Sequence, residues 1–397
     1  MRLPRSNRLQ SLESYPFAVI NEKVAELRAR GIEPVDFGVG DPRTPTPEIV
    51  REECKTALDR HATSGYPPYK GSQPYREAVA AWVKRRFGVE LDPETQITST
   101  IGSKEGIFNF PLAYVNPGDV VLCPTPAYPP YVRGTQFAGG SCYFLPLLAE
   151  NDFLPDLDAV PEAVARKAKI LWLNYPNSPT GAVATLDFFK RTLEWGRERG
   201  ILVVNDEAYS EISFQDEPHP SILQAGIEGA LSFQSMSKRS AMTGWRIGWT
   251  AGDTDAVLAF REVKTNIDSG TPWFIQDAAI AALQDDAHVK AMVKEYRIKR
   301  DLLADTFVGI GLPDCRPAAT IHFWQRVPEG MDGLTFAQRL VEPGIAVVGT
   351  PGAWISDPAP DGGNPGHSYV RFSLVPTIEE TQTACARIKA NASKLLA

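Results

Sequence analysis

Residues 235–249 read Ser-Met-Ser-Lys-Arg-Ser-Ala-Met-Thr-Gly-Trp-Arg-Ile-Gly-Trp and hold one lysine among small hydroxyl side chains. Such surroundings strip water from Lys238, which lowers its pKa and suits the amine to forming a Schiff base. Arg246 carries a planar fork that fits a phosphate dianion, and Ser235 and Ser237 add hydroxyl donors. An amine that bonds an aldehyde beside groups that grip a phosphate predicts a site for pyridoxal 5′-phosphate (PLP).

A surface loop with a lysine and an arginine is the alternative, and the length of the joint motif disfavours it. At this segment the chain resembles the class I and II aminotransferases of PLP fold type I. Four other runs look like the LL-diaminopimelate aminotransferase branch of that family: residues 102–106, 115–121, 153–157 and 208–212. The resemblance extends from Tyr15 to Arg371 and so covers nearly the whole chain.

Composition narrows the class of protein further. The chain of 397 residues is long enough for two domains or one large one, and its net charge of −7 includes no long run of one sign. This argues against nucleic acid as the main partner. Five scattered cysteines without metal spacing predict free thiols in a reducing cytoplasm and no metal site. We also expect no membrane span, because no window of about 18 apolar residues exists.

Strands and helices alternate between residues 95 and 250, which predicts an α/β fold with a mostly parallel sheet flanked by helices. The resemblance implies a seven-stranded sheet of the fold type I kind and a smaller α+β domain. We expect an N-terminal arm and part of the small domain in residues 1–45, the large PLP-binding domain in residues 46–289, and the small C-terminal domain in residues 290–397.

A glycine turn opens a helix at Gly102, and such a turn presents free backbone N–H groups to an anion. The resemblance implies that Ser103 and Lys104 bind the cofactor phosphate there. It also implies that Tyr66 crosses the interface of a homodimer, with its hydroxyl on the phosphate of the neighbouring chain. Each active site would then be built from two chains.

Asp206 closes a buried strand, where a carboxylate beside the pyridine nitrogen would keep that nitrogen protonated. In the resembling family the equivalent of Tyr209 donates to the ring oxygen, and that of Tyr128 stacks on the ring. Most relatives carry Asn directly before Pro-Thr-Gly; here Ser178 takes that place and Asn177 lies one residue earlier. We expect both to belong to the cofactor site, with Ser178 reaching the ring oxygen through a water.

Arg371 is flanked by apolar residues, so its burial is costly unless it meets an anion such as the α-carboxylate of an amino acid. The resemblance places Gly40 over the substrate, Tyr15 at the mouth of the site, and Lys104 and Tyr128 within reach of the substrate.

The implied reaction moves an amino group between an amino acid and a 2-oxo acid, with Lys238, Asp206 and Tyr209 as the catalytic groups. The resemblance favours LL-diaminopimelate with 2-oxoglutarate, in lysine biosynthesis. An aminotransferase for aspartate, alanine or N-succinyl-diaminopimelate stays open, as does a PLP-dependent carbon–sulfur lyase. A non-catalytic binding protein of this fold is disfavoured, because only about 30 residues precede the first motif, too few for a DNA-binding module.

Overall fold

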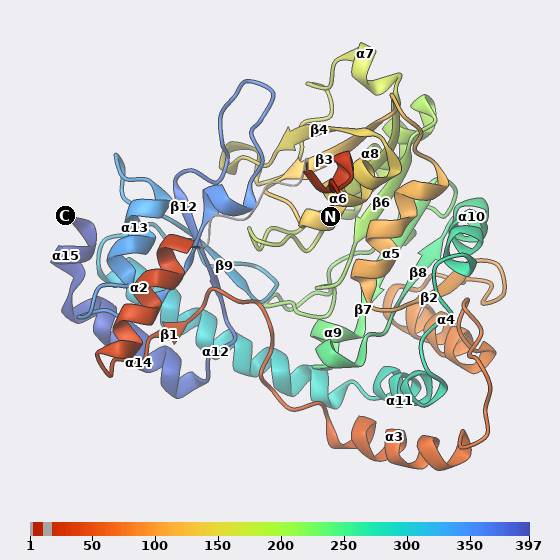
Figure 1. Ribbon diagram of the computed structural model, residues 1–397, viewed down its shortest axis with the longest axis horizontal. Helices are drawn as coiled ribbons and strands as arrows, with labels where there is room; N and C mark the ends of the chain where they lie inside the picture. Colours follow the sequence, from red (N-terminus) through yellow and green to blue (C-terminus); the bar gives the residue numbers. More distant parts are fainter. Residues whose placement is uncertain (1–2, 11–17) are drawn as a thin grey trace.

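The largest sheet has seven strands in the order β2-β8-β7-β6-β5-β3-β4, in a computed structural model that describes residues 3–10 and 18–397 (Figure 1). β8 is antiparallel to β2 and β7, and the other neighbours are parallel, so the predicted mostly parallel α/β sheet is confirmed. The strands are β2 Ile97–Thr100, β3 Val120–Thr125, β4 Ser141–Pro146, β5 Ala168–Leu173, β6 Leu202–Asp206, β7 Ala230–Ser235 and β8 Gly248–Gly252.

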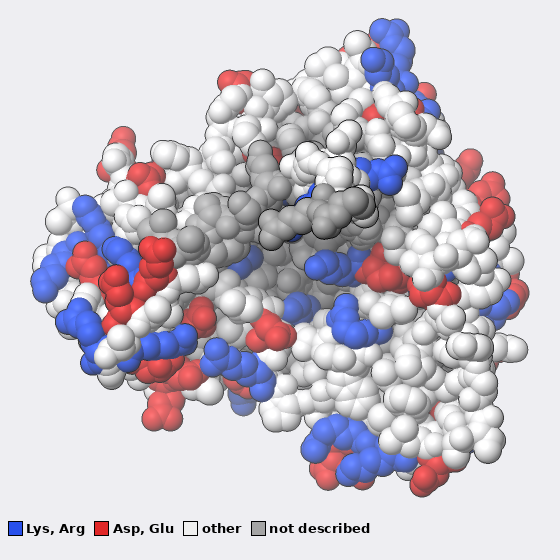
Figure 2. Space-filling view, viewed as in Figure 1, with Lys and Arg blue, Asp and Glu red and all other residues white. Residues whose placement is uncertain are grey.

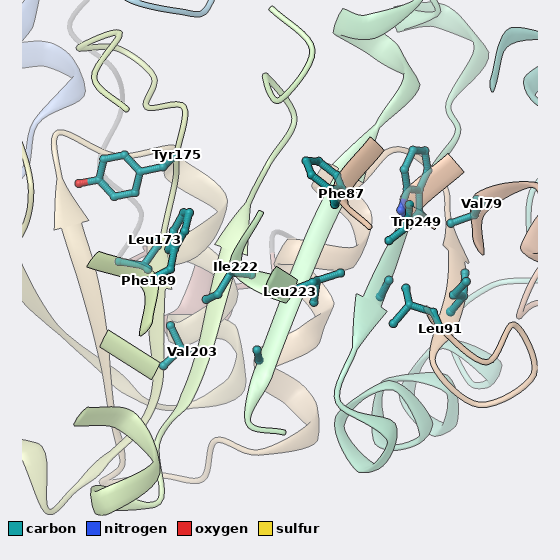
Figure 3. Packing of buried hydrophobic residues seen from close by; sticks show 14 of the residues in the cluster. Val79, Phe87, Leu91, Leu173, Tyr175, Phe189, Val203, Ile222, Leu223 and Trp249 are labelled. Carbon is teal, nitrogen blue, oxygen red and sulfur yellow. The ribbon is translucent and has the colours of Figure 1, made fainter. Parts of the chain in front are cut away.

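Helices cover both faces of this sheet, which is why its central strands are buried at nearly every residue rather than at alternate ones. Along β5, Leu171 and Leu173 enter one core, while Ile170 and Trp172 enter another on the opposite face. The first core, part of which Figure 3 draws, also contains side chains of α4, α8 and α11; the second contains those of α5, α6 and α10. The helices of this half are α3 Glu48–Arg60, α4 Gln73–Phe87, α5 Ser103–Asn109, α6 Pro129–Ala138, α7 Glu162–Ala165, α8 Leu186–Arg199, α9 Met236–Arg239, α10 Thr254–Thr265 and α11 Trp273–Gln284.

A third core joins the two ends of the chain. Val35 in β1 pairs with Val347 in β10, and the antiparallel sheet β11-β12-β9 packs beside them. The elements of this half are α2 Ala18–Ala29, β1 Val35–Asp36, α12 Ala287–Gly309, β9 His322–Arg326, α13 Gly333–Leu340, β10 Val347–Val348, β11 Thr350–Pro351, β12 Tyr369–Ser373, α14 Ile378–Ala390 and α15 Ala392–Leu396; the short α1 is Asn7–Gln10. Figure 1 shows this half beside the large sheet, with α12 reaching from one to the other.

The topology brings distant residues to one edge of the large sheet. The neighbouring parallel strands β6 and β7 end at Asp206 and Ser235, and β5 ends directly before Asn174. Carboxyl ends of parallel strands are where such sheets place ligands. Lys238 follows at once in α9, whose first turn is capped by the Ser235 hydroxyl.

Candidate active site

A pocket of about 720 Å³ opens at this edge, between the large sheet and the sheet β11-β12-β9. It brings together most residues singled out from the sequence: Gly40, Ser103, Lys104, Tyr128, Ser178, Asp206, Tyr209, Ser235, Ser237, Lys238, Arg246 and Arg371. Basic side chains gather around the hollow in the centre of the face drawn in Figure 2. The surroundings therefore favour ligands with negative charge.

Lys238 has the weakened basicity that its sequence context predicts. Burial lowers its pKa to about 8, and the charges of Arg371 and Arg246 act in the same direction, against an opposing contribution from Asp41. Its Nζ donates a hydrogen bond to the carbonyl oxygen of Gly40 at 2.5 Å. An amine of this pKa is partly neutral at physiological pH, and so is able to act as a nucleophile and a base.

Arg246 and the turn at Gly102 form the basic end of the pocket. Arg246 holds a left-handed backbone conformation (φ 56°), which is costly for a residue with a side chain. Its Nη1 donates to the Thr243 carbonyl at 2.7 Å, and a Cβ at Gly102 would collide with its guanidinium. Together with the hydroxyls of Ser235 and Ser237, this donor set fits a phosphate dianion.

Asp206 lies at the buried end, 4% exposed. Its Oδ2 accepts from the Tyr131 hydroxyl at 2.8 Å and its Oδ1 from the backbone N–H of Ala208 at 3.2 Å. Burial raises the pKa of Asp206 to about 6, against the effect of these two hydrogen bonds. Within residues 3–10 and 18–397, no basic side chain forms an ion pair with it, so a protonated ring nitrogen would supply the positive charge that this carboxylate lacks.

The turn after β5 places two polar side chains differently from the expectation. Asn177 does not line the pocket: its Oδ1 accepts from the backbone N–H and the hydroxyl of Thr180, at 3.2 and 2.7 Å, and so closes the Pro-Thr-Gly turn. Asn174 lines the pocket instead, with its Oδ1 accepting from the Ser178 N–H at 2.8 Å. Ser178 also lines it, and its side chain opposes the rise that burial causes in the pKa of Tyr209.

Arg371 reaches the pocket from β12. Its Nη2 donates to the Gly38 carbonyl at 2.7 Å and to the Thr350 hydroxyl at 3.3 Å. Its buried Nε has no partner in the described part of the chain. An incoming carboxylate is the group that satisfies such a donor.

Tyr66 and Tyr15 complete the set of residues predicted from the sequence. Tyr66 is 89% exposed and is absent from the lining of this pocket. Tyr15 falls outside the residues that the structure describes.

Sequence reasoning missed three functional neighbours: Asn174, Tyr131 and His322. Asn174 and Tyr131 stood inside runs that were already noted, and the available signal was that Asn174 directly follows a strand and that Tyr131 lies in the segment after one. His322 carried no such signal, because one histidine at the start of an apolar strand is ordinary core composition. Only the antiparallel pairing of His322 with Ser373 brings it to the pocket.

Among the described residues, no helix is long and apolar enough to cross a membrane. The same residues contain no group of three or more His, Cys, Asp or Glu arranged to hold a metal ion. All five cysteines are free thiols.

A mostly parallel α/β sheet with a partly buried lysine of lowered pKa, a buried carboxylate and a donor set that fits a phosphate at its strand ends defines a PLP-dependent enzyme of fold type I. Residues 32–388 match the aminotransferase class I and II family, and the chain belongs to that family. It is therefore a PLP-dependent aminotransferase, and its substrates are an amino acid and a 2-oxo acid.

Relatives and solved structures match over nearly full length. LL-diaminopimelate aminotransferase from Aquifex aeolicus is 45% identical, over 97% of this chain and 98% of that one. A probable N-succinyldiaminopimelate aminotransferase from Thermus thermophilus superposes with a TM-score of 0.86 at 34% identity, covering 94% and 99% of the two chains. An aspartate aminotransferase single mutant from the same organism has a TM-score of 0.88 at 29% identity, covering 98% and 100%.

Proposed function

We propose that this aminotransferase takes the amino group of LL-diaminopimelate and passes it to 2-oxoglutarate, as a cytoplasmic enzyme of lysine biosynthesis. The observation that carries the proposal is the charge of the pocket, which Arg371 and Lys104 both line. Diaminopimelate has a carboxylate at each end, and each needs a basic partner when it leaves water. The name of the Aquifex aeolicus relative, 45% identical, supports the same substrate.

The proposed cofactor contacts follow the pocket from its basic end to its buried end. When bound, PLP supplies an aldehyde for the amine and a ring that withdraws electrons from the α-carbon. Tyr128 would stack on the ring, Asp206 would keep the ring nitrogen protonated, and Tyr209 would donate to the ring oxygen. The phosphate would meet Ser103, Lys104, Ser235, Ser237 and Arg246, with Tyr66 of a second chain.

Lys238 would move the proton. With its Nζ released as a free amine of pKa about 8, it can take a proton from the α-carbon of the substrate and return it to the adjacent carbon on the cofactor side. Arg371 would hold the α-carboxylate and so fix the face of the α-carbon that Lys238 reaches. Gly40, whose carbonyl already accepts from Lys238, would lie over the substrate.

Steady-state rates with LL-diaminopimelate and 2-oxoglutarate test the proposal against aspartate, alanine and N-succinyl-diaminopimelate as donors. The expected result is the highest kcat/KM for LL-diaminopimelate. If that donor is not turned over while a monocarboxylic or succinylated donor is, the substrate assignment is wrong and the aminotransferase assignment stands. Release of a thiol, ammonia and a 2-oxo acid from a sulfur-containing amino acid, with no 2-oxo acid added as acceptor, would instead indicate a carbon–sulfur lyase.

Lys104→Ala is expected to weaken LL-diaminopimelate far more than it weakens alanine. Lys104 would pair with the distal carboxylate, which alanine lacks, so the ratio of kcat/KM for the two donors should fall about tenfold, the value of one charge-assisted hydrogen bond. Lys190→Ala, on an exposed helix face, is the matched control and should leave the ratio unchanged. Equal losses for both donors would mean that Lys104 serves the phosphate alone.

We further propose a homodimer with shared sites. Tyr66 is 89% exposed, and the neighbouring Tyr69 and Ile267 are 40% and 47% exposed, so apolar surface gathers where the resemblance puts the partner. The turn that ends at Gly270 packs on the backbone of Pro68, which places these segments side by side. The divisions near residues 45 and 289 stay a prediction.

Mixing two inactive chains tests the shared site. If Tyr66 serves the partner, a heterodimer of Lys238→Ala and Tyr66→Ala carries both lesions in one site and none in the other. Co-expressed chains should then recover up to about half of the wild-type activity per heterodimer. Activity no greater than the sum of the two separate variants would show that Tyr66 serves its own chain.

A further inference from the structure

The phenol of Tyr209 has two polar neighbours. The imidazole Nε2 of His322 lies 3.2 Å from the Tyr209 hydroxyl, and the side chain of Ser178 is close enough to oppose the rise that burial causes in the pKa of the phenol. Both neighbours line the same pocket as Lys238. A phenol has one proton and two lone pairs, so its neighbours decide where the proton points.

His322 is itself held in place. It is 3% exposed at the start of β9, its Nδ1 lies 3.1 Å from the Ser373 hydroxyl on the paired strand β12, and a Cβ at Gly40 would collide with its Cε1. Burial lowers its pKa well below the usual value, and the nearby charges of Arg371 and Lys238 lower it further. The ring is therefore neutral at physiological pH and carries a single N–H.

Two directions of this chain of hydrogen bonds are possible. If Nδ1 carries the proton, it donates to Ser373, and Nε2 accepts from Tyr209, which turns the phenol proton away from the pocket. If Nε2 carries the proton, Ser373 donates to Nδ1 and His322 donates to Tyr209. The phenol proton is then available to a ligand, and an electron-rich oxygen in the pocket favours this second direction.

We propose that His322 is a positioning residue: with Ser373 behind it and Ser178 beside it, it directs the Tyr209 hydroxyl proton to the ring oxygen of the cofactor. This inference rests on the role proposed for Tyr209 above. It also gives Ser178 a role at the ring oxygen that acts through Tyr209. In this arrangement His322 acts on the cofactor through the Tyr209 hydroxyl.

The pH titration of the absorption band of the holoenzyme, without substrate, tests the proposal. With PLP bound, its ring oxygen would share a proton with the nitrogen of Lys238, and a hydrogen-bond donor on that oxygen would weaken its hold on the shared proton. Losing the donor therefore raises the midpoint of the titration. His322→Phe is expected to raise it by about one pH unit, and Ser373→Ala by about half of that.

His322→Gln places an amide N–H close to the position of Nε2 and should restore the midpoint to within about 0.3 unit of the wild type. Ser373→Ala adds no volume, so it carries the test if His322→Phe does not fold. His219→Phe, a buried histidine outside the pocket, is the matched control and should leave the midpoint unchanged. In kinetics, His322→Phe should lower kcat more than it changes KM.

The reference variant is Tyr209→Phe, which separates the inference from the proposed function. If Tyr209→Phe raises the midpoint while His322→Phe and Ser373→Ala leave it unchanged, Tyr209 keeps its role and the inference about His322 is overturned. If Tyr209→Phe also leaves it unchanged, the role of Tyr209 fails and the inference fails with it. An equal shift in His322→Phe and His322→Gln would mean that packing, not hydrogen-bond direction, sets the midpoint.

Discussion

Lys238→Ala is expected to lower kcat for amino transfer by at least about a thousandfold, because it removes both the covalent attachment point and the proton carrier. The structure holds one amine of lowered pKa in the pocket, buried beside the carbonyl of Gly40. Lys104 lines the same pocket, but it is exposed and its proposed role is to bind an anionic group, so we do not expect it to take over proton transfer.

Half-reactions measured with a single amino donor show whether the loss lies in the chemical step. Borohydride reduction of the wild-type holoenzyme followed by peptide mapping should label Lys238 alone. The folded state is checked by thermal unfolding, and Lys104→Ala is the matched control, with a far smaller loss toward alanine. A label on another lysine, or near-normal kcat in Lys238→Ala, would contradict the assignment.

Local patterns of the sequence were sufficient for much of this site. Asp206 ends one buried strand and Lys238 comes shortly after another, and chemistry at the end of such a strand is readable because parallel strands end at one edge. The turn at Gly102 was also readable from local sequence, because it directly joins a strand to the start of a helix. These predictions required no knowledge of which strands pair or in which register they pair.

The rest of the site depends on contacts between residues far apart in sequence. His322 meets Tyr209 because β9 pairs with β12 in one particular register, which no local periodicity specifies. The sequence placed both Asn177 and Ser178 in the cofactor site, because they occupy adjacent positions before Pro-Thr-Gly. In the structure, the Oδ1 of Asn177 accepts hydrogen bonds from Thr180 within the turn, whereas Ser178 lines the pocket.

Asp206→Asn is expected to lower kcat/KM by at least about a thousandfold, close to the effect at Lys238. An amide carries no charge and cannot keep the ring nitrogen protonated, so the ring loses its power to stabilise the negative charge that develops at the α-carbon. Glu207→Gln is the matched control. Glu207 is the next residue and is also buried, but its carboxylate accepts from Ser221, Ile222 and Gln234 outside the pocket.

The same substitution should have the opposite effect on the stability of the cofactor-free protein. Burial raises the pKa of Asp206 to about 6 from an ordinary value of 3.8, so between these values the folded state binds more protons than the unfolded state. The free energy of unfolding therefore falls as pH rises from about 4 to about 6, and the cost, up to about 3 kcal/mol, persists at higher pH. Asp206→Asn removes this cost. Without cofactor, the variant should be more stable than the wild type above about pH 6 and no more stable below about pH 4.

Denaturant unfolding across this range measures the difference in stability. Adding PLP should reverse the sign of the difference at neutral pH, since only the carboxylate pairs with a protonated ring. A stability difference independent of pH would show that Asp206 is ionised with equal ease in both states, and that the carboxylate is not held ready for a cationic partner.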